Sequence, residues 1–359
     1  MRVLFVTQYV DHILFFFLRE LATKTALTVV FEAENEWTRE LVRVAERCER
    51  IVPRSRFDKQ FQASIERLWS AGQFDVIQSF HGNAQLANLI HWNKRGLPIV
   101  GYRAYIGHLT FLENPSMYWS VRSPRLAAVV AVSTAVRGYL QSFRFLKPRN
   151  VEVVCHGINR QTVASRSEER FGLRERLALP PDAFVVMYVA SLRPYKRFEL
   201  FVGAAQQLSQ LPIHFVHVGN AKGWEERPGK PRNLHFLGHQ AQPFSIMAEA
   251  DVLVSAAHNE AFGRGNLEAM ALGKPLIGSN TGGLLDLIDD GVTGMLFETR
   301  NGEDFARKVM AYFEDRSLIA KHGKNALARV DERFSSQAMM RQYLDVYQRV
   351  VARPRELAN

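Results

Sequence analysis

The sequence is poor in cysteine and has no apolar run of membrane-spanning length. Its two cysteines, Cys48 and Cys155, provide no disulfide framework and are typical of a reducing compartment. The apolar segment 13–18 is far shorter than the ~20 residues that a transmembrane helix needs. The first residues also lack the basic region, long apolar core and small-residue cleavage site of a secretory signal peptide. These absences predict a cytoplasmic protein that is soluble or peripherally attached to the inner face of the membrane.

Acidic residues are outnumbered by basic ones, mainly in the first half of the chain. The net formal charge is +10, of which residues 1–170 carry +8 and residues 171–359 carry +2. An anionic membrane lipid, an anionic glycan or a nucleic acid is each a partner that suits such a surplus. A solvated surface tuned for solubility is the simpler interpretation of any single arginine. The basic residues are scattered and form no basic-aromatic motif, so no nucleic-acid partner is expected.

Three consecutive phenylalanines stand near the start of the chain. Asp11-His12 precede the run 13–18, which contains Phe15, Phe16 and Phe17. Consecutive residues of a helix cannot all face one side. Core packing explains part of the run, and we expect some of these rings to be exposed, where they would meet an acceptor lipid or an anionic membrane surface.

Short apolar segments of strand length alternate with helical segments along the whole chain. At 359 residues the chain exceeds the size of a typical single core, which predicts two domains. The polar segment 159–182, which ends in Pro180-Pro181, separates two such series. Alternation of strands and helices predicts parallel, doubly wound sheets, and hence an α/β fold. We predict Rossmann-like domains at 1–160 and 161–334 that face an interdomain cleft, with a helix at about 335–359 packing back onto the first. The predicted strands are 2–7, 27–31, 74–79, 98–102, 127–132, 151–155, 184–190, 213–218, 234–237, 252–255, 275–278 and 295–297.

The segment 258–271 is the richest in chemistry. It follows a predicted strand, and helix-forming residues dominate from Asn266 to Leu272. Gly263 and Gly265 stand at the start of this helix, where missing side chains allow backbone to approach a ligand. Exposed amides and the helix dipole at such a start favour an anion, and a diphosphate fits well.

Two glutamates, Glu260 and Glu268, flank that helix start. A carboxylate accepts hydrogen bonds from vicinal hydroxyls in bidentate fashion. A nucleotide-sugar carries hydroxyls at both ends of a diphosphate, on the ribose and on the hexose. The two carboxylates therefore match the layout of that ligand, and the alternative is a surface helix with two solvated glutamates.

This segment resembles the signature of the retaining glycosyltransferases of family 4, also called glycosyl transferases group 1, which have the GT-B fold. The resemblance extends over about 184–300 and includes Thr281-Gly282-Gly283, with Asp286 where family members usually have glutamate. It is weaker over 1–160. The resemblance implies that Glu260 contacts the donor sugar and Glu268 the ribose. The donor-binding residues that it implies are Gly219, Gly238, Phe262, Gly263, Arg264, Gly265, Asn266 and Glu268.

The resemblance also implies a basic pair that neutralises the diphosphate. Lys196 matches the family lysine, whereas Ser191 stands at the usual arginine position. We expect Arg193, two residues later, to take over that role. Fixed cations stabilise the charge that phosphoryl oxygens gain as the glycosidic bond breaks. No Asp-x-Asp element follows a strand, so no metal or other cofactor is expected.

The first half offers three candidates for the active-site histidine that many family members carry. Arg103 occupies the matching place after a predicted strand, and His81 and His108 are alternative contributors. A lone histidine is more often structural than catalytic.

The predicted function is transfer of a sugar, with retention, from a UDP, GDP or ADP-type donor. The acceptor hydroxyl would belong to a glycan, a lipid-linked sugar or a small molecule, in the synthesis of polysaccharide, lipopolysaccharide or glycolipid. Two alternatives stay open: a nucleotide-sugar epimerase on the same scaffold, and a non-catalytic nucleotide-sugar binder. Fold class alone does not decide among them.

Overall fold

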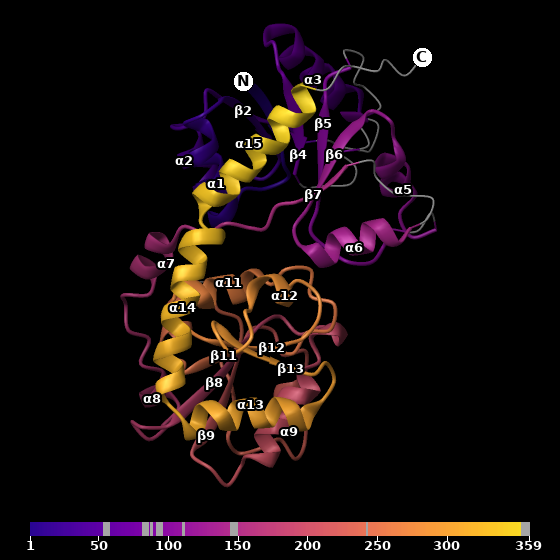
Figure 1. Ribbon diagram of the computed structural model, residues 1–359. Helices are drawn as coiled ribbons and strands as arrows, with labels where there is room; N and C mark the ends of the chain where they lie inside the picture. The colour runs from indigo at the N-terminus through magenta and orange to yellow at the C-terminus, as the bar shows by residue number, and fades with distance from the viewer. Residues whose placement is uncertain are drawn as a thin grey trace. The chain divides into compact units, whose positions relative to one another are not determined.

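The computed structural model describes residues 1–52, 58–80, 86, 89–90, 96–109, 112–143, 150–241 and 243–352. The chain divides into two compact units (Figure 1). Unit 1 comprises residues 1–157 together with the last helix, and unit 2 comprises Ile158–Ser335. The sequence predicts a domain boundary after residue 160, and in the structure the first unit ends at residue 157.

Unit 1 contains one parallel sheet of seven strands in the order β3-β2-β1-β4-β5-β6-β7. Apart from the segment between β4 and β5, a helix connects each strand to the next, as in a doubly wound sheet. The elements are β1 (Arg2–Val6), α1 (His12–Ala22), β2 (Ala26–Phe31), α2 (Glu36–Leu41), β3 (Arg47–Arg50), α3 (Lys59–Ala71), β4 (Val76–Ser79), β5 (Ile99–Arg103), α5 (Pro115–Arg122), β6 (Leu126–Ala131), α6 (Thr134–Ser142), β7 (Val151–Val153) and α15 (Ser336–Ala352).

Unit 2 contains a parallel sheet of six strands in the order β10-β9-β8-β11-β12-β13. The predicted α/β class with two parallel sheets is therefore confirmed. The elements are α7 (Arg160–Arg166), α8 (Leu173–Arg176), β8 (Phe184–Val189), η1 (Pro194–Lys196), α9 (Phe198–Gln207), β9 (Ile213–Val218), η2 (Trp224–Glu226), β10 (Leu234–Phe236), α10 (Phe244–Ala248), β11 (Val252–Ser255), α11 (Arg264–Ala271), β12 (Leu276–Ser279), α12 (Leu284–Leu287), β13 (Gly294–Phe297), α13 (Gly302–Glu314) and α14 (Ser317–Arg333).

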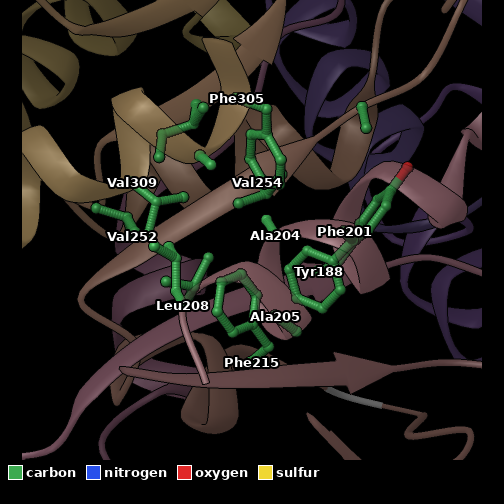
Figure 2. Packing of buried hydrophobic residues seen from close by; sticks show 14 of the residues in the cluster. Tyr188, Phe201, Ala204, Ala205, Leu208, Phe215, Val252, Val254, Phe305 and Val309 are labelled. Carbon is green, nitrogen blue, oxygen red and sulfur yellow. The ribbon is translucent and has the colours of Figure 1, made fainter. Parts of the chain in front are cut away.

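The core of unit 2 lies between its sheet and the helices α9 and α13. Figure 2 shows Tyr188 and Phe215 of the sheet packed with Phe201 of α9, and Phe305 of α13 belongs to the same cluster. The strands β8 and β11 are adjacent at the centre of the sheet, although β9, β10 and α10 separate them in sequence. The chain order thus reverses between β8 and β11, which is the point where doubly wound sheets bind ligands.

Helix α1 is buried on nearly every side, and the predicted exposure of its phenylalanines is wrong. Phe15 and Phe16 are each 7% exposed, and Phe17 is fully buried. Trp37 of α2 lies against Phe15, with ring centroids 5.3 Å apart, and against Phe16, at 6.0 Å. On another side, Phe17 packs against Tyr343 of α15 at 4.8 Å. Neighbouring helices, in addition to the sheet, therefore shield rings that point in different directions.

The last long helix belongs to unit 1, although it follows unit 2 in sequence. Figure 1 shows α15 beside α1, and the two helices pack against each other. Its Tyr347 hydroxyl donates to Oε1 of Gln78 in β4 at 3.1 Å. Among the described residues, none of the helices combines the length and apolar character needed to cross a membrane.

Candidate active site

The start of α11 lies at the carboxyl end of the unit 2 sheet and offers uncapped backbone amides. Gly263 precedes the helix with a φ of +94°, and no side chain caps this end. A Cβ atom on Gly263 would collide with the side-chain amide of Asn266, and one on Gly265 would lie 3.8 Å from the carbonyl oxygen of Val189 in β8. The helix therefore begins over the end of β8, with first-turn N–H groups that suit an anion.

Beside this helix start, the ammonium group of Lys196 donates to the carboxylate of Glu260. Nζ lies 2.6 Å from Oε2, and the two side chains are 17% and 12% exposed. The backbone is fixed on both sides of the pair: the hydroxyl of Tyr188 donates to the Lys196 carbonyl at 2.6 Å, and the N–H of His258 donates to the Tyr195 carbonyl at 2.7 Å. Burial raises the pKa of Tyr188, so its hydroxyl stays protonated as a donor. The segments after β8 and β11 are thereby tied together.

A turn after β12 supports the Glu260 backbone from behind. The N–H of Gly283 donates to the carbonyl oxygen of Glu260 at 2.7 Å. A Cβ atom on Gly282 would overlap that same oxygen, and one on Gly283 would overlap the carbonyl of Ala261. The sequence shows these glycines as part of the family signature but not their task, which is to let two backbones touch.

A second close approach joins the ends of β8, β9 and β10. The N–H of Gly219 donates to the carbonyl of Gly238 at 2.8 Å, and a Cβ atom on Gly219 would overlap the carbonyl oxygen of Ala190. Both glycines adopt positive φ angles, of +136° and +67°. They allow the backbone segments at the carboxyl end of the sheet to approach one another closely.

The remaining predicted donor-binding side chains fall into two groups. Arg264, Asn266 and Glu268 are half-buried in α11. Phe262 is 2% exposed and packs against Phe334, with ring centroids 6.0 Å apart, so its ring belongs to the packing of unit 2. Arg193 is exposed, three positions before Lys196, and lines a cavity that also includes Ser191.

In unit 1, Arg103 lies at the end of β5 and is fully buried. Its Nε donates to the carbonyl of Tyr105 at 3.1 Å, its Nη2 donates to the carbonyl of Gly107, and its guanidinium lies 3.5 Å from the Tyr105 ring centroid. Burial lowers the pKa of Arg103. Its Nη1 has no hydrogen-bond partner among the residues that the structure describes. In this structure Arg103 holds the loop 104–108 in place.

The histidine candidates differ in position from Arg103. His108 stands on the same loop at a φ of +53°, but its side chain is 74% exposed and lies 3.4 Å from the carboxylate of Glu113. His81 lies outside the described residues. Within the described part of the chain, no group of three or more His, Cys, Asp and Glu residues is arranged to hold a metal ion.

Comparison with known proteins identifies related sequences for both units. The family model Glycosyltransferase Family 4 matches residues 18–162, and the model Glycosyl transferases group 1 matches residues 169–329. The chain is 32% identical to the capsular polysaccharide biosynthesis glycosyltransferase CapM of Staphylococcus aureus over 235 residues, 61% of this chain and 60% of CapM. It is 30% identical to the D-inositol 3-phosphate glycosyltransferase of Geodermatophilus obscurus over 196 residues, 48% of this chain and 42% of that protein. The chain spans about half the length of the curated relatives it matches.

Solved structures with the same architecture are GT-B glycosyltransferases. A glycosyltransferase from Rickettsia africae has a TM-score of 0.80 at 17% identity, with 98% of this chain and 99% of that chain covered. HepE of Anabaena in complex with UDP has a TM-score of 0.76 at 21% identity, with 97% and 100% covered. These likenesses establish the fold, and the two family models establish the sequence relationship. The chain belongs to glycosyltransferase family 4 and has the GT-B fold.

Proposed function

We propose that this protein is a retaining glycosyltransferase that moves a sugar from a nucleoside-diphosphate donor to an acceptor hydroxyl. The observation that carries the proposal is the Lys196–Glu260 pair beside the uncapped start of α11. An ammonium group and free helix amides suit a diphosphate, and a carboxylate suits the hydroxyls of a sugar. The pair thus joins, at one place, the two chemistries that a nucleotide-sugar needs.

In the proposed complex, the diphosphate binds the first-turn amides of α11 and the ammonium group of Lys196. Glu260 accepts hydrogen bonds from the donor sugar, and Glu268, eight positions later, accepts them from the ribose. As the bond between the anomeric carbon and the phosphate oxygen breaks, Lys196 stabilises the charge of the leaving group, which makes the step independent of a metal ion. The acceptor hydroxyl attacks from the same face and gives its proton to the departing phosphate, so the configuration is retained.

Structural likeness supports a proposal for the donor base. HepE, which shares the fold, was solved with UDP and with UDP-glucose. We infer a UDP-sugar in preference to the GDP and ADP types. The relatives include a D-inositol 3-phosphate glycosyltransferase, an N-acetyl-alpha-D-glucosaminyl L-malate synthase and a capsular polysaccharide biosynthesis glycosyltransferase. The proposed acceptor is therefore a glycan, a lipid-linked sugar or a small hydroxyl compound, bound through unit 1.

Thermal-shift screening of UDP, GDP, ADP and their sugars tests the proposal, because a ligand that binds only the folded state raises the melting temperature. UDP and a UDP-sugar should raise it, and glucose alone should not. Incubation with donor alone separates the alternatives: a new sugar epimer would favour an epimerase, and an absence of any donor hydrolysis or transfer would favour a binder. Product stereochemistry then tests retention.

The proposed location is the cytoplasmic face of a membrane, and the contact is the segment around α5 rather than α1. Leu112 is 91% exposed and Trp119 is 58% exposed. The guanidinium of Arg122 lies 5.7 Å from the Trp119 ring centroid, and unit 1 carries most of the positive charge of the chain. Exposed tryptophan with nearby arginine suits the interface of an anionic bilayer.

A further inference from the structure

The cavity lined by Ser191 and Arg193 lies in unit 2, between the segment after β8 and the segment after β9. Its volume is about 770 Å³, and its lining includes Arg193, Phe198, Asn220, Lys222, Trp224 and Arg227. We refer to it as the basic cavity. Lys196, the other cation predicted to act with Arg193, pairs instead with Glu260. Arg193 therefore lines the basic cavity, whereas Lys196 is not among its lining residues.

The basic cavity carries positive charge that no described acid neutralises. Arg193, Lys222 and Arg227 form no ion pair with any residue in the described part of the chain. The acid among its lining residues, Glu199, lies 3.3 Å from the guanidinium of Arg197. Helix α9 also begins at this cavity without a side-chain cap. Its first-turn amides add to the positive potential, which favours an anionic ligand.

An aromatic wall stands beside these charges. The guanidinium of Arg227 lies over the indole of Trp224 at 3.6 Å from the ring centroid, and Trp224 meets Phe198 edge-on at 5.4 Å. A guanidinium stacked in this way keeps its N–H edges for an oxyanion, and its flat face contributes apolar surface. Such a wall suits a ring that carries both C–H surface and a negative charge.

The loop that presents the cations is fixed by its own hydrogen bonds. The N–H of Lys222 donates to Oδ1 of Asn220 at 3.0 Å, and the N–H of Leu192 donates to the Asn220 carbonyl at 2.9 Å. Lys222 adopts a φ of +53°, which is unfavourable for a residue with a side chain. The backbone at Lys222 is therefore fixed by the loop itself, and the exposed side chain extends from it.

We propose that the basic cavity binds an anionic sugar, one that carries a carboxylate or a phosphate group. This inference rests on the proposed function, in which unit 2 handles sugars. The anionic sugar comes either from the donor, as the transferred residue, or from the acceptor. Arg193, Lys222 and Arg227 are exposed, and one carboxylate or phosphate can bridge two of them, an attraction that a neutral sugar lacks.

Trp224 provides a direct reporter of binding in the basic cavity. The chain has five tryptophans, and Trp224 is the only one in residues 158–335. We would label the full chain with 5-fluorotryptophan, assign the Trp224 signal with Trp224→Phe, and titrate D-glucuronate, D-glucose 6-phosphate and D-glucose at constant ionic strength. The two anionic sugars should shift the Trp224 signal, and D-glucose should not. The double variant Lys222→Gln/Arg227→Gln should weaken both anionic sugars about tenfold and leave UDP affinity unchanged.

Two comparisons identify the source of the sugar. Tighter binding of UDP-glucuronate than of UDP-glucose, lost in the double variant, assigns the anionic sugar to the donor. Binding of glucuronate that persists when UDP-glucose is saturating assigns it to the acceptor.

The inference is overturned if neither anionic sugar moves the Trp224 signal, or if D-glucose moves it equally. It is also overturned if the double variant, folded by its thermal melt, loses UDP affinity by the same factor as sugar affinity, since the cavity would then belong to the nucleotide site. Failure of the proposed function itself would be seen separately, as a wild-type protein that binds no nucleotide-sugar.

Discussion

The Nζ atom of Lys196 lies 2.6 Å from Oε2 of Glu260, with both side chains largely shielded from water. One residue follows β8 and the other follows β11, the two strands between which the chain order of the sheet reverses. Because each charge has the other as its partner, the loss of either changes both the site and its electrostatics.

Glu260→Gln and Lys196→Met should each lower kcat/KM for the donor by about 100-fold or more, roughly 3 kcal/mol, because each removes a charge that the transition state uses. Each should also cost about 1–3 kcal/mol of folding stability by leaving a partly buried charge unpaired. Initial rates and denaturant unfolding measure the two effects. Arg307→Gln, which removes an exposed ion pair with Asp304, is the matched control and should change neither. Near-normal transfer by either site variant would refute the assignment.

Gly282→Ala should disable donor binding, whereas Gly229→Ala should not. The two positions have similar φ angles, of +65° and +72°, so alanine costs each about 1–2 kcal/mol. At Gly282 the new Cβ would overlap the carbonyl oxygen of Glu260, whereas at Gly229 no heavy atom lies within 4 Å. The affinity for a UDP-sugar, measured by calorimetry, separates the two variants. Equal losses of affinity would show that backbone strain alone, without displacement of Glu260, explains the effect.

Arg103→Lys should lower the stability of unit 1 by about 2–4 kcal/mol, because an ammonium group cannot reach both carbonyls that the guanidinium holds. Transfer should fall with it, as the loop 104–108 loosens. His108→Ala, on the same loop but exposed, should leave stability within about 0.5 kcal/mol and activity within about twofold. A stable but inactive Arg103→Lys would instead point to direct contact with substrate.

Leu112→Glu/Trp119→Glu should reduce binding to anionic vesicles at low salt about tenfold, because it removes exposed apolar surface and adds negative charge. Leu285→Glu, at a residue 51% exposed in unit 2, is the matched control and should bind normally. Vesicle flotation measures both. Phe16→Ala should instead cost about 3–5 kcal/mol of stability, since Phe16 is 7% exposed. A wild-type protein that does not float with the vesicles would end the membrane proposal.

Acid should destabilise unit 2 through His235. Burial, and then the charge of His214, lower its pKa from 6.5 to about 4. The two rings meet at 3.2 Å between Nδ1 of His214 and Nε2 of His235. The unfolded chain binds a proton near pH 6.5 and the folded chain does not, so stability present above pH 6.5 is lost as pH falls toward 4. Because the His235 side chain is partly exposed, water screens its charge and limits the loss of unfolding free energy to about 2 kcal/mol. His235→Gln should make the unfolding free energy less dependent on pH over that range. An unchanged pH dependence would exclude His235 as the cause.

The alternation of apolar segments was enough to predict both sheets, and the residue pattern of the segment 258–271 was enough to predict a helix that starts near Gly263. Sequence pattern did not reveal β3, Arg47–Arg50, because an edge strand of polar residues has no apolar period. Exposure of Phe15 and Phe16 was wrongly predicted, because the helical period treats one face as buried and takes no account of Trp37. Both failures concern contacts between segments distant in the sequence.

In the candidate site, too, local motifs identify the residues, whereas the contacts between distant segments appear only in the folded structure. Lys196 and Glu260 were singled out from local motifs, and their ion pair depends on strands that are neighbours only in the folded sheet. Gly282 was visible as a family residue, yet its purpose depends on the Glu260 carbonyl that it touches. The joint action of Arg193 and Lys196 on a diphosphate stays a prediction. In the structure Arg193 lines the basic cavity and Lys196 pairs with Glu260.

Helix α15 also has a consequence for how the chain folds during synthesis. Tyr343 and Tyr347 contact residues such as Phe17 and Gln78, which lie in the first 80 residues. All of unit 2 is translated between these two parts. The ribosome therefore finishes unit 2 while the sheet of unit 1 still lacks one of its covering helices. Unit 2 is expected to fold first, and the earliest part of the chain to wait longest with apolar surface uncovered, which makes it the natural target for a chaperone.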